Sequence, residues 1–264
     1  MMMLQNTVGV IYGAGGGIGS AVARAFAREG ARLFLAGRRR ASVDAVVRDI
    51  VSTGGSAEAA EVDALDEPAI DCHLQSVIDE AGRVDLAFDA VGIANAGILG
   101  VPLLELDAAQ FALPITTHAM SYFLIARLAA RRMIAQKSGV IMTVTSLLSR
   151  TGAPLVGGYG PAMAAKEALT RNLSAELAPH GIRVVGLRPQ AMPATRTIKD
   201  AFEPRAKATG MTWDQWQAFL ATRTHPRRLM TVEEMANVAA FMASDFASGM
   251  TGTTVNLTMG SLDD

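Results

Sequence analysis

The fold of this chain is decided by the stretch VGVIYGAGGGIGS at residues 8–20, which an apolar, alanine-rich run follows at residues 21–27. A β-branched apolar run, a turn dense in glycine and an immediate change to helical periodicity predict a strand, a loop and a helix. Glycines let the backbone turn tightly and approach a ligand closely, and a helix N-terminus directs unpaired N–H groups toward phosphates. The stretch therefore predicts a binding site for a diphosphate. Its candidate binding residues are Gly13, Gly17, Ile18 and Gly19, in the spacing Gly-x3-Gly-x-Gly.

The composition indicates a well-buried globular chain of 264 residues, of which half are hydrophobic and 19% are charged. This length suits one large α/β domain, and no apolar run approaches the roughly 20 residues of a membrane span. The first six residues carry no basic region before an apolar stretch, so we expect no signal peptide. The single cysteine, Cys72, excludes an internal disulfide and a cysteine-based metal cluster, and it fits the reducing cytoplasm. The net charge of −1 gives no indication of a nucleic-acid partner, and we expect neither a metal site nor a membrane partner.

Strand-like and helix-like segments alternate along the chain. This alternation predicts an α/β fold, a single Rossmann-like doubly wound parallel sheet of about seven strands with helices on both faces, in one domain over residues 1–264. After the first strand, the predicted strands lie at 32–36, 57–62, 84–91, 140–145, 183–187 and 254–257, and the predicted helices at about 20–29, 41–53, 67–81, 108–137, 160–179 and 232–243. Residues 189–228 are expected to form an irregular insertion, and its apolar side chains indicate a lid over an apolar substrate pocket. These side chains are Met192, Phe202, Met211, Trp213, Trp216 and Phe219.

The predicted cofactor is NADP, with NAD less favoured. An acidic residue after the second strand would favour the free 2′-OH of NAD, but this chain has Arg38, Arg39 and Arg40 there. The planar, always charged guanidinium matches a phosphate, so Arg38 or Arg39 is the candidate for the 2′-phosphate, with a solvated cationic helix start as the alternative. The candidates after the third and fourth strands are Asp63 for the adenine amino group, its neighbour Ala64, and Ala90 and Gly92 as a rim of small residues.

The glycine loop, Asp63, Ser146, Tyr159 and the closing pattern MTGTTVN at residues 250–256 resemble the short-chain dehydrogenase/reductase family over nearly the whole chain. Ser146 stands 13 residues before Tyr159, the spacing usual for that family. The resemblance implies that a hydride moves between a nicotinamide and a carbonyl carbon. It also implies that Tyr159 is the acid/base and that Ser146 orients the substrate oxygen.

One departure from the family pattern concerns the active-site lysine. The family has a lysine one helical turn after the tyrosine, where it binds the nicotinamide ribose and lowers the tyrosine pKa, but this chain has Met163 at that position. The nearest lysine is Lys166, seven residues after Tyr159. A separation of seven returns to nearly the same helix face, about 4.5 Å further along the axis than the usual lysine. Lys166 is therefore a candidate substitute, and a surface or interface lysine is the alternative.

Two further departures lie nearby. By counting along the helix before the fifth strand, His118 takes the place of the family's asparagine, so it is a candidate proton relay, with a packed histidine as the alternative. Pro189-Gln190 replaces the family's Pro-Gly near the nicotinamide, and we expect the Gln190 side chain to narrow that end of the cleft. The family's Asn-Asn-Ala-Gly after the fourth strand reads Asp89-Ala90-Val91-Gly92.

The favoured function is an NADP(H)-dependent oxidoreductase of the carbonyl reductase or alcohol dehydrogenase type, acting on a small apolar carbonyl or alcohol. A tyrosine without a nearby cation stays protonated at neutral pH, so loss of the lysine should impair oxidation more than reduction. The alternatives are a catalytically degraded nucleotide-binding or regulatory protein and an enoyl reductase, whose Tyr-x6-Lys spacing this chain matches. The resemblance also implies a small-molecule substrate and a homodimer or homotetramer through the helices at 108–137 and 160–179.

Overall fold

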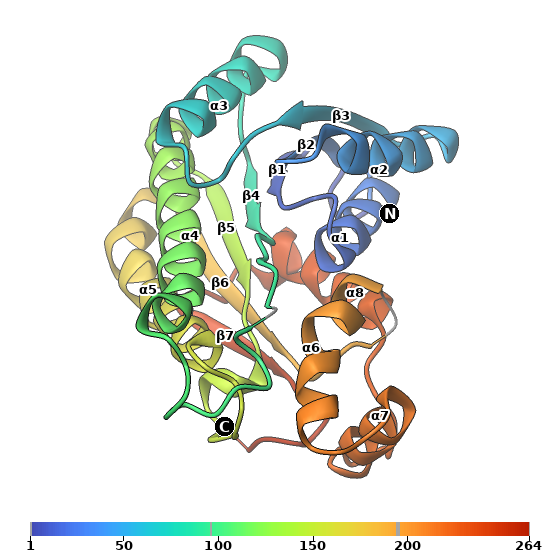
Figure 1. Ribbon diagram of the computed structural model, residues 1–264. Coiled ribbons are helices and arrows are strands. Elements are labelled where there is room, and N and C mark those ends of the chain that lie inside the picture. Colours follow the sequence, from blue (N-terminus) through green and yellow to red (C-terminus); the bar gives the residue numbers. More distant parts are fainter. Residues whose placement is uncertain (1, 96, 194–195, 264) are drawn as a thin grey trace.

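A computed structural model describes residues 2–95, 97–193 and 196–263 of the chain. Seven strands form one parallel sheet in the order β3-β2-β1-β4-β5-β6-β7 (Figure 1). The strands are β1 (Val8–Tyr12), β2 (Arg32–Gly37), β3 (Ser56–Glu61), β4 (Leu86–Asp89), β5 (Gly139–Val144), β6 (Ile182–Pro189) and β7 (Thr253–Leu257). The predicted parallel sheet is confirmed, but β4 is shorter than expected because the chain leaves the sheet after Asp89 to border a cleft.

Helices cover both faces of the sheet, as predicted. The helices α1, α2 and α8 pack on one face, and α3, α4 and α5 pack on the other (Figure 1). The helices are α1 (Gly17–Arg28), α2 (Arg40–Ser52), α3 (Glu67–Ala81), α4 (Ala108–Gln136), α5 (Tyr159–Leu177), α6 (Arg196–Ala208), α7 (Trp213–Thr222) and α8 (Val232–Ala243), with short 3-10 turns η1 (Leu147–Ser149), η2 (Ala178–His180) and η3 (Asp245–Ala247). None of these helices, taken over the described residues, has the length and apolar character of a membrane span.

The central strand β1 shows why the sheet carries two layers of helices. Every β1 residue is buried, and successive side chains point to opposite faces. Val10 and Tyr12 join the core under α3, α4 and α5, whereas Ile11 joins the core under α1, α2 and α8. A strand buried on both faces is apolar throughout, which explains the continuous run in the sequence.

The strand order places a crevice beside the glycine loop. The chain builds β2 and β3 on one side of β1 and then returns to build β4 on the other side, so the carboxyl ends of β1 and β4 diverge. Gly13 follows β1 with a φ of +79°, and a Cβ there would lie 2.4 Å from the carbonyl oxygen of Ala90. A Cβ at Gly19 would lie 2.4 Å from the carbonyl oxygen of Gly13. Both positions therefore require glycine for the loop to close against the start of α1.

The predicted irregular insertion at residues 189–228 is largely helical. It contains α6 and α7, which lie beyond the carboxyl end of the sheet in Figure 1, although residues 194 and 195 fall outside the described residues. A capping box starts α7, with Thr212 and Gln215 satisfying each other's backbone N–H groups. Periodicity missed α6 because Pro204 stands inside it among charged residues.

Candidate active site

Two hollows meet at Tyr159. The first, the glycine-loop cleft, has a volume of about 640 Å³ and is bordered by the glycine loop, the residues after β2 and β4, and the start of α5. The second, the apolar cavity, has a volume of about 360 Å³ and lies between the segment after β5 and the insertion with α6 and α7. Tyr159 and Phe202 line both hollows. Groups bound in the two hollows would therefore meet at the phenol of Tyr159.

The glycine loop leaves hydrogen-bond donors facing the cleft. The helix α1 begins at Gly17, and its N-cap residue Gly16 has no side chain to satisfy the N–H groups of the first turn. Free N–H groups and the positive end of the helix dipole together bind anions such as phosphate. The predicted cofactor-binding residues that line this cleft are Gly13, Gly17, Ile18, Ala90 and Gly92. Gly19 instead provides the close contact under Gly13.

The end of the cleft beside β2 is cationic. Arg38 and Arg39 line it, both are exposed, and neither forms an ion pair with another residue that the structure describes. Arg40 differs from them, because its Nε lies 2.9 Å from Asp44 Oδ1 on the next turn of α2. The two uncommitted guanidinium groups are suited to an additional phosphate at this end.

Besides Gly19, three predicted cofactor residues lie elsewhere than in the lining of this cleft. Asp63 is exposed and accepts a hydrogen bond of 3.0 Å from the N–H of Leu65, while Ala64 is buried in the core. Pro189 ends β6 and lines the apolar cavity. A role of these three residues in cofactor binding stays a prediction.

Ser146 and Tyr159 line the apolar cavity together. Ser146 follows β5 and begins η1, where its Oγ accepts a hydrogen bond of 3.3 Å from the N–H of Leu148. Tyr159 begins α5 with its ring held edge-on between His118 and Phe202, at centroid distances of 5.9 and 5.8 Å. Burial raises the pKa of Tyr159 to about 12, and hydrogen bonding with the Ser146 hydroxyl partly opposes that rise. The phenol is therefore neutral at pH 7 and able to donate a proton.

No cation among the described residues contributes to the pKa of Tyr159. Met163 stands one turn after Tyr159, 2% exposed, at the cleft wall. Lys166 is also buried, so its interpretation as a surface lysine is wrong, and its Nζ lies 2.9 Å from Asp89 Oδ2 and 2.9 Å from the carbonyl oxygen of Val144. The ammonium is thus paired where β4 and β5 end, and Lys166 lines the glycine-loop cleft together with Tyr159 and Met163.

His118 is packed rather than solvated. It is 5% exposed and lines the glycine-loop cleft, and neither of its ring nitrogens has a hydrogen-bond partner within the described part of the chain. Burial and, to a smaller extent, the positive charge of Lys166 lower the pKa of His118 to about 4, although the charge of Asp89 partly opposes them. His118 is therefore a neutral imidazole at pH 7, and its role in a proton relay stays a prediction.

Sequence reasoning missed a buried ion pair beside Ser146. Glu167 on α5 accepts hydrogen bonds from Arg188 Nε at 2.8 Å and Arg188 Nη2 at 2.9 Å. It also accepts from Ser149 Oγ at 2.5 Å and Thr145 Oγ1 at 3.1 Å. Burial alone would raise the pKa of Glu167, but the hydrogen bonds from Arg188 and Ser149 hold it below its usual value. Because Thr145 and Ser149 flank Ser146, this carboxylate fixes the segment that carries the serine.

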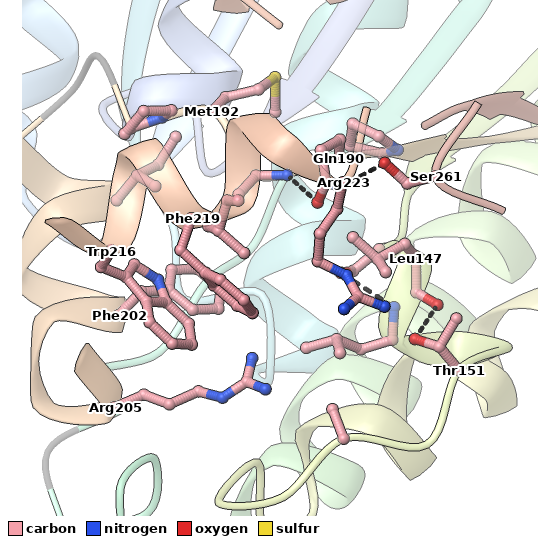
Figure 2. A pocket seen from close by; sticks show the side chains of 18 of the residues that line it. Leu147, Thr151, Gln190, Met192, Phe202, Arg205, Trp216, Phe219, Arg223 and Ser261 are labelled. Atoms are coloured by element: carbon pink, nitrogen blue, oxygen red, sulfur yellow. Dashed lines mark hydrogen bonds between the residues drawn. The ribbon is translucent and has the colours of Figure 1, made fainter. Parts of the chain in front are cut away.

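The apolar cavity is walled by the insertion. All six apolar side chains predicted for the lid line it, and Figure 2 shows Met192, Phe202, Trp216 and Phe219 around the opening. Gln190 corrects a prediction, because its side chain turns to the C-terminal segment and donates to Ser261 Oγ at 2.7 Å. It lines the apolar cavity instead of narrowing the glycine-loop cleft.

Comparisons with known proteins agree with this geometry. The family model described as enoyl-(acyl carrier protein) reductase matches residues 13–261. The 7alpha-hydroxysteroid dehydrogenase of Escherichia coli (strain K12) is 27% identical over 263 residues, which cover 100% of this chain and 97% of the relative. The cis-4-hydroxycyclohexanecarboxylate dehydrogenase of Sinomonas cyclohexanicum is 32% identical over 247 residues, 93% of this chain and 92% of the relative. The crystal structure of NAD+-bound xylitol dehydrogenase matches with a TM-score of 0.88 at 27% identity, covering 96% of this chain and 97% of that one.

Proposed function

Since the chain belongs to the short-chain dehydrogenase/reductase family, we propose that it reduces a small, largely apolar carbonyl compound with NADPH. The relatives reported above include several alcohol dehydrogenases. One observation carries the proposal: Tyr159 lines both the glycine-loop cleft and the apolar cavity, with Ser146 beside it in the cavity. Two of the relatives are named for ring-shaped alcohols, so a cyclic ketone is the form of substrate that we propose.

The glycine-loop cleft fits a dinucleotide. Its loop closes only with glycine at Gly13 and Gly19, and the first turn of α1 leaves N–H groups for a diphosphate. Arg38 and Arg39 would hold the 2′-phosphate of NADP, since both are exposed cations without an ion-pair partner among the described residues.

The residues at the junction then perform proton transfer. A bound nicotinamide supplies the hydride. Ser146 Oγ donates a hydrogen bond to the substrate oxygen, and the neutral phenol of Tyr159 gives its proton to that oxygen as negative charge develops on it. The raised pKa of Tyr159 keeps the phenol protonated at pH 7, which suits reduction and opposes oxidation.

The test is NADPH consumption with cyclic ketones by the wild type and by Tyr159→Phe and Ser146→Ala. We expect each variant to lose roughly 100- to 10,000-fold in kcat, the range for a positioned proton donor, while the Kd for NADPH stays within about twofold. Unchanged kcat in Tyr159→Phe would contradict the proposed role of the phenol.

A second function is favoured by one observation, the burial of Met163 where a cation would sit beside Tyr159. Under this reading the chain binds the nucleotide and acts as a regulatory protein without turnover. Tight NADPH binding together with no reduction of any ketone tested would favour it. Enoyl reduction ranks below both functions, because Lys166 is committed to Asp89 and Val144.

We also propose a homodimer or homotetramer in which α4 and α5 meet the neighbouring subunit. Large apolar side chains stand exposed on α4, and such side chains favour a partner surface. They include Phe111, Met120 and Phe123.

The exposed free thiol of Cys72 fits the predicted cytoplasmic location, where thiols stay reduced.

A further inference from the structure

Two arginines stand in the wall of the apolar cavity, on the side opposite the sheet. Arg205 comes from α6 and Arg223 from the end of α7, and Figure 2 shows both side chains extending toward the middle of the cavity. The described residues that line this cavity include no Asp or Glu. Two cations therefore face a cavity whose lining carries no negative charge.

Neither guanidinium is satisfied by the protein. Arg205 lies over the ring of Trp216, with Cζ 5.1 Å from the ring centroid, and its Nε is buried without a hydrogen-bond partner in the part of the chain that the structure describes. Arg223 lies near the ring of Phe219, with Cζ 5.9 Å from the centroid, and makes no ion pair with the described residues. Arg205 is partly buried, whereas Arg223 is exposed. A partly buried cation without a counter-charge is costly, and an anion bound beside Arg205 would remove that cost.

The chemistry of the wall narrows the class of anion. A guanidinium forms two parallel hydrogen bonds with a carboxylate, and the aromatic rings under these arginines hold their planes in place. The rest of the lining, including Met192 and Phe202, suits an apolar body. The cofactor does not account for these arginines, because Arg205 and Arg223 line only the apolar cavity, whereas Arg38 and Arg39 line the glycine-loop cleft.

We propose that the substrate is an apolar keto acid, with its carboxylate bound by Arg205 and Arg223 and its carbonyl at Ser146 and Tyr159. This inference rests on the proposed function for the carbonyl end, but the carboxylate site itself can be tested without turnover. It also refines the predicted small apolar substrate, which gains one negative charge at the end remote from the reacting carbon.

The binding test uses two probes of equal size, cyclohexanecarboxylate and cyclohexanecarboxamide, titrated into the full chain at pH 7 with and without NADP+. The combined emission of Trp213 and Trp216, which both line the cavity, reports binding. We expect the carboxylate to bind ~10- to 100-fold more tightly than the amide, the range for a charge-assisted hydrogen bond. Arg205→Met and Arg223→Met each keep an apolar side chain in the wall and should reduce that preference at least severalfold, leaving the Kd of the amide unchanged.

The matched control is Lys207→Met, which removes one positive charge from the exposed face of the same helix. It should keep the full preference for the carboxylate. Thermal unfolding of each variant verifies that α6 and α7 remain folded. Equal affinities for the two probes in the wild type, no binding of either, or an undiminished preference in both arginine variants would overturn the carboxylate site.

Turnover separates this inference from the proposed function. With NADPH, the paired substrates are 4-oxocyclohexanecarboxylate and its carboxamide. Carboxylate-selective binding without reduction of either would support the anion site and contradict the reductase. Equal kcat/KM for the two would support the reductase and contradict the anion site.

Discussion

The buried pair of Lys166 and Asp89 allows a quantitative prediction. The side chains are 1% and 0% exposed, and their charged atoms lie 2.9 Å apart. The variant Lys166→Met leaves the Asp89 carboxylate with two hydrogen bonds, from the Val91 N–H at 3.1 Å and from Thr143 Oγ1 at 3.2 Å, but without a cation. Removing one partner of a buried ion pair costs about 3–5 kcal/mol of the free energy of unfolding. For a chain of this size that loss lowers Tm by roughly 6–20 °C.

The double variant Asp89→Asn/Lys166→Met is the matched control. An asparagine oxygen can still accept from the Val91 N–H, and the methionine fills the volume of the lysine stem, so no charge is left buried. We expect its free energy of unfolding to return to within about 1 kcal/mol of the wild type, because a buried pair and an apolar replacement are often nearly equal. Urea denaturation of the wild type, both single variants and the double variant gives the coupling energy. If the double variant is as unstable as Lys166→Met, the reasoning from an unpaired buried charge is refuted. If it is stable but inactive, Lys166 or Asp89 has a chemical role besides the structural one.

Three other predictions concern the site. Because the pKa of Tyr159 is raised to about 12, the rate of alcohol oxidation should rise nearly tenfold per pH unit from pH 7 to pH 10, whereas the rate of reduction should stay level. Steady-state rates in both directions check this prediction. Equal oxidation rates at pH 7 and pH 10 would contradict it. Arg38→Ala should weaken NADPH binding by roughly 10- to 100-fold and leave NADH binding unchanged, as measured by nicotinamide fluorescence. The control Arg40→Ala should change the binding of neither nucleotide. A parallel loss of affinity for both nucleotides in Arg38→Ala would argue against a 2′-phosphate site. Glu167→Gln should lose about 3–5 kcal/mol of unfolding free energy, since it removes the buried carboxylate that accepts two hydrogen bonds from Arg188. The exposed control Glu176→Gln should change stability by less than about 0.5 kcal/mol. Similar stabilities of the two variants in urea would show that the buried pair contributes little.

The elements that were predictable from the sequence are those with a local signature. The β1 run and the glycine loop reveal themselves through periodicity and composition, and the spacing from Ser146 to Tyr159 reflects one strand end and one helix start. Helix geometry predicted that Lys166 shares a face of α5 with Tyr159, and both residues line the glycine-loop cleft. It could not find the partner, because Asp89 reaches Lys166 only through the register of β4 against β5, where Asp89 pairs with Thr143. That register is a property of the packed sheet.

The dependence on contacts between distant segments also explains the other residues whose surroundings the sequence did not predict. Glu167 directly follows Lys166 in the sequence, and two adjacent charges on one helix suggest a solvated face. Both are buried, because β6 brings Arg188 to Glu167 and the end of β4 brings Asp89 to Lys166. In the insertion, the apolar residues were correctly assigned to a pocket wall, but Arg205 and Arg223 look like ordinary surface charges until α6 and α7 turn them inward. Buried polar pairs of this kind depend on contacts between distant segments, which one sequence does not show.

The distribution of charge across the site links these findings to the direction of the reaction. The ionic groups near Tyr159 among the described residues are internally paired, Lys166 with Asp89 and Glu167 with Arg188. The uncommitted cations lie at the two far ends, where the glycine-loop cleft meets β2 and where α6 and α7 wall the apolar cavity. Such a site can bind one anionic ligand at each end, a cofactor in the glycine-loop cleft and a substrate in the apolar cavity, while the reacting centre between the two stays neutral. A neutral centre disfavours a phenolate but still allows a phenol to protonate an alkoxide, which is the stronger base. The proposed preference for reduction over oxidation near pH 7 rests on this neutral reacting centre.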